Sequence, residues 1–469
     1  GLFSFDPSTG KFNHFSTNSG NKGLNNNLIS DIIQVDKDHL MISTDQGGIN
    51  YYNMTSKTFE YIVQDKTIEN GLNTNGIICL HHDKEGILWV GTSRGGVNYY
   101  NPKSNKIQLL KHNPKNPNSL AYDIVGYLYE DDEGMIWIGT DGGGLNIYDP
   151  KTGDFSLFVH NPSNPHSISG NVIRCITEDK DGDVWVGTWG SGLNRYDRET
   201  KKFHRYSPDP MDNSSISTNI IWHFLIDHQD NLWLSSFHSG IEIFDKKKGV
   251  VKRFSSDPKD PRSLSHNDVW LIYEDDLQNI WICTRDGINL YDSLTNSFTV
   301  YNEFPDNDIG AFCRDKEGKL WAGSRSKGLF LFEQDGTIVK VYDQSNGLPS
   351  NTIHAIVEDN RGNLWISTND GICWLDQKRQ EFNTYSKSDG LQGNVFFEQS
   401  FLKTKSGKLY FGGYNGISSF YPDSLAIAKN NYIPKVYITD FKLFNKTVAI
   451  GDREVLKRNI ILSHEIELD

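Results

Sequence analysis

One phrase recurs along this chain and constrains its fold more than any other feature. It reads MIWIGTDGGGLNIYD at 135–149 and VWVGTWGSGLNRYD at 184–197, with related copies before and after. Each copy has one marker residue, usually Trp, and successive markers are 48, 48, 48, 48, 48, 40, 44 and 45 residues apart. A period of this length indicates one supersecondary unit repeated along the chain. The markers are Met41, Trp89, Trp137, Trp185, Trp233, Trp281, Trp321, Trp365 and Tyr410.

One repeat consists of four short apolar segments separated by turns. In residues 171–206 the segments VIRCIT, VWVGT, LNRYD and KFHRY are separated by EDKDG, by Gly-Ser-Gly and by a charged turn. Apolar β-branched and aromatic runs without a helical period predict strands. Four antiparallel strands, here named a to d, form one blade of a β-propeller. We therefore predict an all-β fold, in which the marker Trp of strand b fills the gap between neighbouring blades.

The number of blades in the ring leaves two alternatives. The last repeat, 394–420, contains strands a to c, so another segment must supply its outer strand. The segment KIQLL at 106–110 would close a seven-bladed ring, whereas KFNHF at 11–15 would close a ring of nine blades. We prefer seven blades, because this is the commoner solution.

The seven-bladed solution divides the chain into three parts. Residues 103–424 form the seven-bladed propeller, and residues 1–102 are the last blades of a preceding, incomplete propeller. A linker with two prolines follows at 421–434, and residues 432–469 then alternate apolar and polar side chains. Such alternation is typical of the strands of a sandwich, so we expect the beginning of an immunoglobulin-like β-sandwich there, incomplete.

Composition excludes several classes of function. The net charge of −13 argues against a nucleic-acid partner, and no apolar stretch is long enough to span a membrane. The segment DKDGD at 179–183 resembles the beginning of a calcium loop, but its counterparts in other repeats change their charges, which favours a hairpin over a metal site. The five cysteines fit no disulfide framework and are expected as free thiols in the core. We expect no cofactor.

The repeated phrase resembles the two-component regulator propeller repeat. The connectors HNPKNPNSLAYD at 112–123 and HNPSNPHSISGN at 160–171 resemble the connector of that family, and IPKVYITDFKLFNKTV resembles the opening of its triple-tyrosine domain. Two positions depart from the pattern: Ser367 replaces the Gly of the Gly-Thr pair, and Tyr410 replaces Trp. Together these features resemble the periplasmic sensor of a hybrid two-component system of the Bacteroides type.

The resemblance implies a function for the whole protein. Members of the family carry two propellers, the sandwich, a transmembrane helix and a histidine kinase, and they detect glycan breakdown products. It implies a periplasmic region of an inner-membrane protein that binds an oligosaccharide and regulates carbohydrate-utilisation genes. Members work as dimers, so a homodimer is expected. Attachment to the membrane would use a helix outside these residues, and the kinase domain is likewise outside them, so this region itself is not expected to be an enzyme.

Side chains in the loop between strands b and c predict where a ligand binds. The scaffold repeats, yet the two residues after the Gly-Thr pair change their chemistry from blade to blade, which a purely architectural position would not do. In register these residues are Ser93 and Arg94, Asp141 and Gly142, Trp189 and Gly190, Phe237 and His238, Arg285 and Asp286, Arg325 and Ser326, Asn369 and Asp370, and Tyr414 and Asn415.

A second variable position lies eleven residues before each marker, near the beginning of strand a. It is occupied by Arg174, Trp222, Trp270 and His354, and elsewhere by Ile78, Gly126, Gly310 and Gln399. Aromatic rings suit the C–H faces of a sugar, and Arg, His, Asn and Asp suit its hydroxyl groups. Ordinary packing between blades and solvated surface charge are the alternatives. The predicted ligand-binding residues are Trp189, Arg174, Trp222, Trp270, His238, Arg285, Arg325, His354, Asp141 and Tyr414.

Two other classes of function stay open. A glycoside hydrolase or lyase needs facing carboxyl groups, and the ones that can be assigned to this face, Asp141, Asp286 and Asp370, belong to blades that are not adjacent. No residues are therefore predicted as catalytic. A protein-binding scaffold is the third class, and it would show no stabilisation by a sugar.

Overall fold

The computed structural model describes residues 1–17, 23–65, 71–84, 86–101, 106–376, 381–426, 442–443 and 446–448. The chain divides into two compact units, 1–422 and 423–469. Antiparallel sheets make up the first unit, which confirms the predicted all-β class. The sandwich predicted over 432–469 lies outside the described residues, apart from the short ladder of β38 (Lys442–Leu443) and β39 (Lys446–Thr447). The division at residue 102 stays a prediction.

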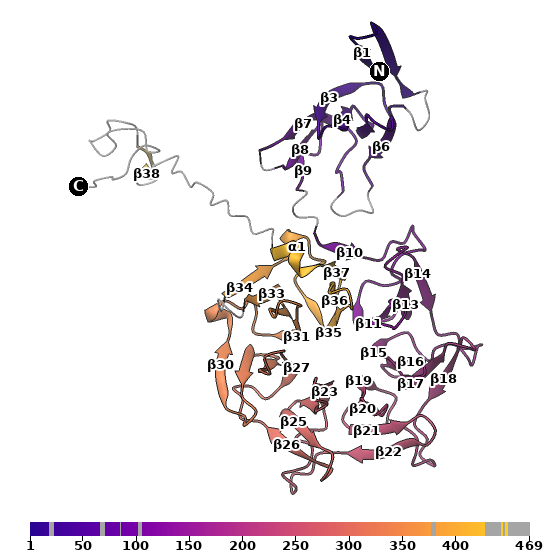
Figure 1. The fold of residues 1–469 in the computed structure, drawn as a ribbon, viewed down its shortest axis with the longest axis vertical. Coiled ribbons are helices and arrows are strands. Elements are labelled where there is room, and N and C mark those ends of the chain that lie inside the picture. Colours follow the sequence, from indigo (N-terminus) through magenta and orange to yellow (C-terminus); the bar gives the residue numbers. More distant parts are fainter. Residues whose placement is uncertain are drawn as a thin grey trace. The chain divides into compact units, whose positions relative to one another are not determined.

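Seven four-stranded sheets follow one another around a ring, with strand a of each blade innermost (Figure 1). Blades 1 to 3 are β11 (Val125–Glu130), β12 (Ile136–Thr140), β13 (Leu145–Tyr148) and β14 (Phe155–Phe158); β15 (Ile173–Glu178), β16 (Val184–Thr188), β17 (Leu193–Asp197) and β18 (Lys202–Tyr206); and β19 (Ile221–Ile226), β20 (Leu232–Ser236), β21 (Gly240–Asp245) and β22 (Gly249–Phe254).

Blades 4 to 6 are β23 (Val269–Glu274), β24 (Ile280–Thr284), β25 (Gly287–Asp292) and β26 (Ser297–Tyr301); β27 (Ile309–Arg314), β28 (Leu320–Ser324), β29 (Leu329–Phe332) and β30 (Ile338–Tyr342); and β31 (Ile353–Glu358), β32 (Leu364–Thr368), β33 (Gly371–Asp376) and β34 (Glu381–Tyr385). Blade 7 is β35 (Phe396–Lys403), β36 (Leu409–Gly413), β37 (Gly416–Phe420) and β10 (Gln108–Leu110). Short 3₁₀ turns occur at Gln344–Asn346 and Lys387–Asp389, and α1 (Pro422–Ala426) follows β37.

The ring is closed by strand β10, which precedes blade 1 in the sequence. Strand β10 pairs antiparallel with β37, so that Leu110 lies opposite Ile417. The segment predicted to supply the outer strand of the last repeat therefore does so, and the seven-bladed arrangement is confirmed. The rival segment, β2 (Lys11–Phe15), pairs instead with β1 (Leu2–Asp6).

The residues before the ring form further propeller sheets. One has four strands, β3 (Ile29–Gln34), β4 (His39–Thr44), β5 (Gly48–Asn53) and β6 (Thr58–Ile62). The next has three described strands, β7 (Ile77–His82), β8 (Leu88–Thr92) and β9 (Val97–Tyr100). Cys79 in β7 is exposed, contrary to the expected packing of all five thiols, whereas the other four cysteines are free and buried.

The marker residues of the ring pack against the following blade, as predicted. Trp185 lies in a buried cluster with Ile221 and Phe224 of the next strand a, and the markers of blades 1 and 3 to 5 repeat this arrangement. Trp365 of blade 6 packs on Phe420 of blade 7, whereas Trp89, before the ring, is 40% exposed. Tyr410 of blade 7 packs with Val125 and Leu128 of blade 1, so the same contact closes the ring. A single blade cannot bury this face alone, which is why the sheets are stable only as a ring.

A carboxylate fixes each marker indole, and within the ring these carboxylates are buried. The Trp185 Nε1–H donates to Asp179 at 2.7 Å, and the other Oδ of Asp179 accepts from the backbone of its hairpin at Asp181 and Asp183. The same bond recurs in every Trp-containing blade, six residues before the marker. These carboxylates are satisfied by indole and backbone donors, which supports the hairpin interpretation of DKDGD.

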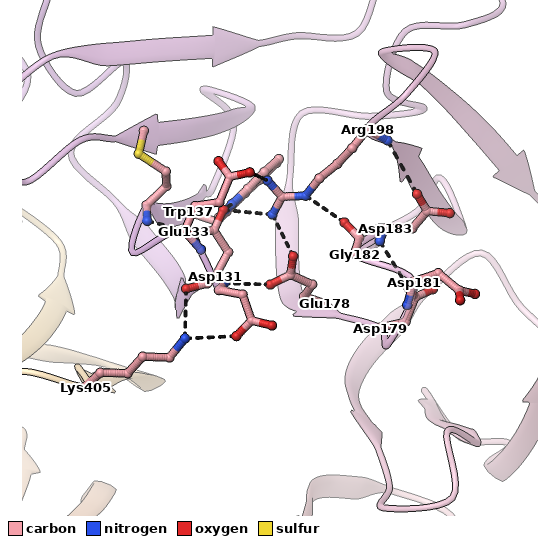
Figure 2. Close-up of polar contacts among 12 residues, drawn as sticks. Asp131, Glu133, Trp137, Glu178, Asp179, Asp181, Gly182, Asp183, Arg198 and Lys405 are labelled. Carbon is pink, nitrogen blue, oxygen red and sulfur yellow. Dashed lines mark hydrogen bonds and ion pairs between the residues drawn. The ribbon is translucent and has the colours of Figure 1, made fainter.

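Neighbouring blades are also joined by buried charges (Figure 2). Arg198, just after β17 in blade 2, donates to Asp131 of blade 1 and to Glu178 of its own blade, each at 2.8 Å, and to the Gly182 carbonyl at 2.6 Å. Burial raises the pKa of Glu178, and Arg198 opposes this shift. At the equivalent position of blade 3, Lys246 reaches back to Asp179 of blade 2 at 3.0 Å. One cation therefore bridges two blades at each of these junctions.

Candidate functional site

Every strand a of the ring carries a β-bulge near its beginning. In blades 1 to 6 one residue is skipped in the pairing with strand b, between Val125 and Tyr127 in blade 1 and at equivalent places in the others. A bulge redirects a side chain away from the regular alternation of the sheet. The skipped residues are those of the second variable position, Gly126, Arg174, Trp222, Trp270, Gly310 and His354.

Three of the predicted aromatic residues lie together. The Trp222 ring contacts Trp189 at 5.6 Å and Trp270 at 5.4 Å between centroids, both edge to face. Phe237, from the next b–c loop, packs on Trp189 at 5.4 Å. Trp189 is 37% exposed whereas Trp270 is 7% exposed, so the aromatic surface extends from the solvent into the interior of the ring. The variable positions of the b–c loops and those of strand a are therefore in contact, as a single binding site requires.

Arg174 lies among these rings. Its guanidinium carbon is 5.4 Å from the centroid of Trp189, 5.5 Å from that of Trp222 and 5.0 Å from that of Phe397. Its Nη2 is 3.7 Å from Asp141, and its buried Nε has no hydrogen-bond partner. Cation–π contacts hold the arginine, while a loose ion pair leaves part of its donor capacity unused.

A second arginine lies on the other side of Trp270. The guanidinium carbon of Arg325 is 4.3 Å from the centroid of the Trp270 ring, and its Nη2 donates to Glu398. The Trp270 Nε1–H donates to Asp308 at 2.8 Å. Burial raises the pKa of Asp308, opposed by the charge of Arg325 and by the indole bond. Blades 4, 5 and 7 thus meet through one interleaved set of rings and charges.

A side chain of blade 7 bonds to two distant blades of the ring. The bulge of blade 7 is longer than the others, from Phe396 to Phe401. The Gln399 side-chain amide donates to the Trp270 carbonyl of blade 4 at 2.6 Å and to the Gly310 carbonyl of blade 5 at 3.1 Å. Gln399 has φ 55°, in the left-handed region. A residue held there stores strain, and such strain clusters at binding sites.

His238 and Arg285 meet at one buried acid. Asp268, 3% exposed in its side chain, accepts from His238 Nδ1 at 2.5 Å and lies 3.6 Å from Arg285. The centroids of the His238 and Phe237 rings are 3.8 Å apart, with the rings tilted at 52°, and this contact joins the group to the aromatic residues. His238 also has a left-handed backbone, with φ 61°.

Tyr414 and His354, the last two predicted residues, differ in their exposure. Tyr414 is 47% exposed and its ring lies 5.6 Å from Phe397. His354 is 7% exposed, its Nε2 is 2.8 Å from Asn369 Oδ1, and burial lowers its pKa. His354 is therefore a buried residue, whereas Tyr414 is exposed to solvent. All ten residues belong to one region at the centre of the ring, which we call the central cluster together with Phe237, Asp268, Asp308, Phe397, Glu398 and Gln399.

Several of these residues were missed in the sequence. Asp268 and Asp308 lie two residues before a bulge, where Ile124, Val172 and Ile220 are apolar in other blades. That internal contrast could have singled them out. Glu398 could have been found in the same way, because it lies twelve residues before its marker, where the other blades of the ring have Val or Ile. Phe397 could not, because an apolar residue at its position does not stand out.

The carboxylates considered for catalysis have structural partners. Asp286 accepts from Asn307 at 3.1 Å, and Asp370 accepts from Asn394 at 2.9 Å. Both bonds fasten a b–c loop to the connector that precedes the next blade. Within the residues that the structure describes, no group of three or more His, Cys, Asp or Glu side chains could hold a metal ion.

Family comparison explains the repeat. The model of the two component regulator propeller matches residues 71–94, 119–142, 167–190, 263–286, 303–326 and 347–370. The chain carries two-component regulator propeller repeats. Each match runs from a connector through strands a and b into the b–c loop, and therefore contains both variable positions of its blade.

Relatives and solved structures agree with this fold. The chain is 30% identical over 147 residues to "Histidine kinase P4" of Formosa agariphila, a match that covers 31% of this chain and 10% of that protein. The chain thus spans about a tenth of this curated relative. It is similar to the extracellular domain of a proposed one component system from B. thetaiotaomicron, at 23% identity and TM-score 0.56, over 98% of this chain and 59% of that one. A streptogramin B lyase is similar at 14% identity and TM-score 0.50, over 67% of this chain and 96% of the lyase. Both likenesses are of fold.

Proposed function

We propose that this chain is the extracytoplasmic sensor region of a hybrid histidine kinase, and that it binds a glycan-derived oligosaccharide at the central cluster. The propeller repeats, the similarity to a histidine kinase and the fold shared with an extracellular domain support the sensor part of the proposal. On this proposal the region is periplasmic, works as a homodimer and regulates genes for carbohydrate use. Among the described residues, no helix is long and apolar enough to cross a membrane.

The partly exposed aromatic surface carries the saccharide part of the proposal. Trp189, 37% exposed, packs edge to face against the half-buried indole of Trp222, which holds it in place. Aromatic faces stack on the C–H faces of a pyranose, and flanking polar groups fix its hydroxyls. Packing alone does not require a tryptophan at this loop position, since the equivalent residues of most other blades are polar and only Phe237 and Tyr414 are also aromatic.

The test is calorimetric titration of the chain with depolymerised plant and host glycans. We expect one saccharide class to bind, and Trp189→Ala to weaken that binding by at least tenfold through loss of the stacking ring. The control is Leu294→Ala, which removes a 93% exposed side chain on the c–d turn of blade 4 and should leave the affinity unchanged. Equal affinities for the Trp189 variant and the parent would refute the assignment of the site.

A turnover assay separates the sensor from an enzyme. The shared fold with a lyase makes this assay necessary, although the likeness is of fold alone. The chain is incubated with the same saccharides, and their masses are followed over time. A sensor returns each saccharide intact, whereas product released in excess of the protein would overturn the proposal.

A further inference from the structure

The charges of the central cluster indicate which kind of saccharide it would take. We infer that the ligand is an uncharged oligosaccharide, rather than one that carries uronic acid or sulfate groups. This inference rests on the proposed function, because it assumes that the central cluster binds a saccharide. It goes beyond the proposed function because it names the chemical class of the saccharide.

The first cation, Arg174, already has an acidic partner within the chain. Its Nη2 lies 3.7 Å from Asp141, and three aromatic rings surround the guanidinium. The side chain is only 14% exposed. An anionic ligand could approach this arginine only by moving Asp141 or by lying beside it, and two like charges in a partly buried site repel each other.

The second cation, Arg325, is compensated more closely. It donates to Glu398 from one side and faces the charge of Asp308 from the other, with its plane over the Trp270 ring. The side chains of Arg325 and Glu398 are 26% and 34% exposed, so the pair itself is within reach of a ligand. What a ligand meets here is an ion pair and not a free cation.

The third group pairs one buried acid with two basic side chains, Arg285 and His238, which are 62% and 66% exposed. Asp268 is almost completely buried and is shared by Arg285 at 3.6 Å and His238 at 2.5 Å. Three guanidinium groups and one imidazole of the cluster thus face four carboxylates, those of Asp141, Asp268, Asp308 and Glu398. The cluster has no surplus of positive charge with which to attract an acidic sugar.

Paired charges are well suited to hydroxyl groups. A hydroxyl both donates and accepts, so it can donate to the carboxylate and accept from the guanidinium of the same pair. Hydrogen bonds to ionised groups are the strong ones. A vicinal diol could therefore engage Arg325 and Glu398 together without separating them, while the exposed face of Trp189 takes the apolar side of the ring.

The experiment compares saccharides that differ only in charge. The chain is titrated with a panel of uncharged plant and host oligosaccharides, and with uronic-acid oligosaccharides before and after chemical reduction of their carboxyl groups to alcohols. We expect binding among the uncharged saccharides, at least tenfold weaker binding of each acidic chain than of its reduced counterpart, and less than twofold change of affinity between about 50 and 500 mM salt, because no ligand charge is screened.

A variant tests the charge compensation itself. Asp141→Asn leaves Arg174 without its acid, so the preference for reduced over acidic chains should fall at least threefold, whereas Asp292→Asn on a distant c–d turn should not change it. Tight binding of acidic chains alone would overturn the inference while leaving the sensor proposal intact. If no saccharide of either kind binds, both the inference and the proposed function are wrong.

Discussion

The cation between blades 1 and 2 offers a direct test of what holds the ring together. Arg198→Met keeps most of the apolar stem but removes the guanidinium. The substitution deletes two bonds of 2.8 Å to Asp131 and Glu178 and one of 2.6 Å to the Gly182 carbonyl. The carboxylates it leaves behind are 0% and 7% exposed in their side chains, so water cannot easily replace the lost charge.

The expected loss in the free energy of unfolding follows from these contacts. Breaking one side of a buried ion pair costs about 3–5 kcal/mol. Arg198 is itself 25% exposed, and Asp131 keeps the bonds from Trp137 and from the backbone of Met135, so the cost is smaller. We expect a loss of about 2–3 kcal/mol in the free energy of unfolding, which for a ring of this size lowers the melting temperature by roughly 5 °C.

The assay is urea and thermal denaturation followed by tryptophan fluorescence. Lys202→Met, which removes an exposed cation from strand β18 of the same blade, is the control and should change stability by less than about 0.5 kcal/mol. An Arg198→Met variant as stable as the parent would refute the view that this cation joins the blades.

The pH dependence of the same variant checks the mechanism. Burial raises the pKa of Glu178, and Arg198 opposes that shift, so the folded pKa rises further when the guanidinium is removed. A carboxyl group with a raised folded pKa loses stability as pH rises from its usual value through the raised one. The deficit of Arg198→Met should therefore shrink between pH 7 and pH 5. A deficit that is the same at both pH values would contradict this explanation.

Three further predictions concern the interior of the ring. Burial lowers the pKa of His223 to about 3, so the unfolded chain takes up a proton below pH 6.5 that the folded chain does not. The free energy of unfolding should therefore fall by about 2 kcal/mol on acidification to pH 5. In urea titrations His223→Gln should remove this part of the pH dependence, whereas His166→Gln, at an exposed site, should not. Trp185→Phe leaves Asp179 without its indole donor and opens a cavity between blades 2 and 3, which should cost about 2–4 kcal/mol in the same denaturation assay, whereas no loss would mean that the bond is dispensable. Gln399→Gly should melt higher than Gln399→Ala by the equivalent of about 1 kcal/mol, because only glycine adopts φ 55° without strain, and the reverse order would contradict the strained backbone.

Much of the fold follows from the spacing of like residues. The period of the markers requires repeated blades, and the missing outer strand of the last repeat requires a segment such as β10 to close the ring. The bond between each marker indole and the acid six residues earlier is equally local, since both belong to one hairpin. Residues that contact each other within one blade come from the same repeat of the sequence, so these contacts recur wherever the phrase recurs.

The binding region was only partly predictable. Comparison of equivalent positions singled out Trp189, Trp222 and Trp270, and the structure brings all three into contact. It did not reveal that Phe397 and Glu398 reach the same place. Their approach to the centre depends on the enlarged bulge of blade 7, which the sequence pattern does not show.

The sequence by itself determined the repeated blade and the set of positions whose chemistry varies, and it favoured closure by seven sheets over nine. Only the tertiary structure decided which of those side chains meet. Gln399 bonds to a carbonyl 129 residues away, and Arg325 to an acid 73 residues away. Such pairs come from blades that are distant along the chain and close at the axis. No periodic pattern relates their residues, because the pairing depends on how the ring closes and not on the content of any one repeat.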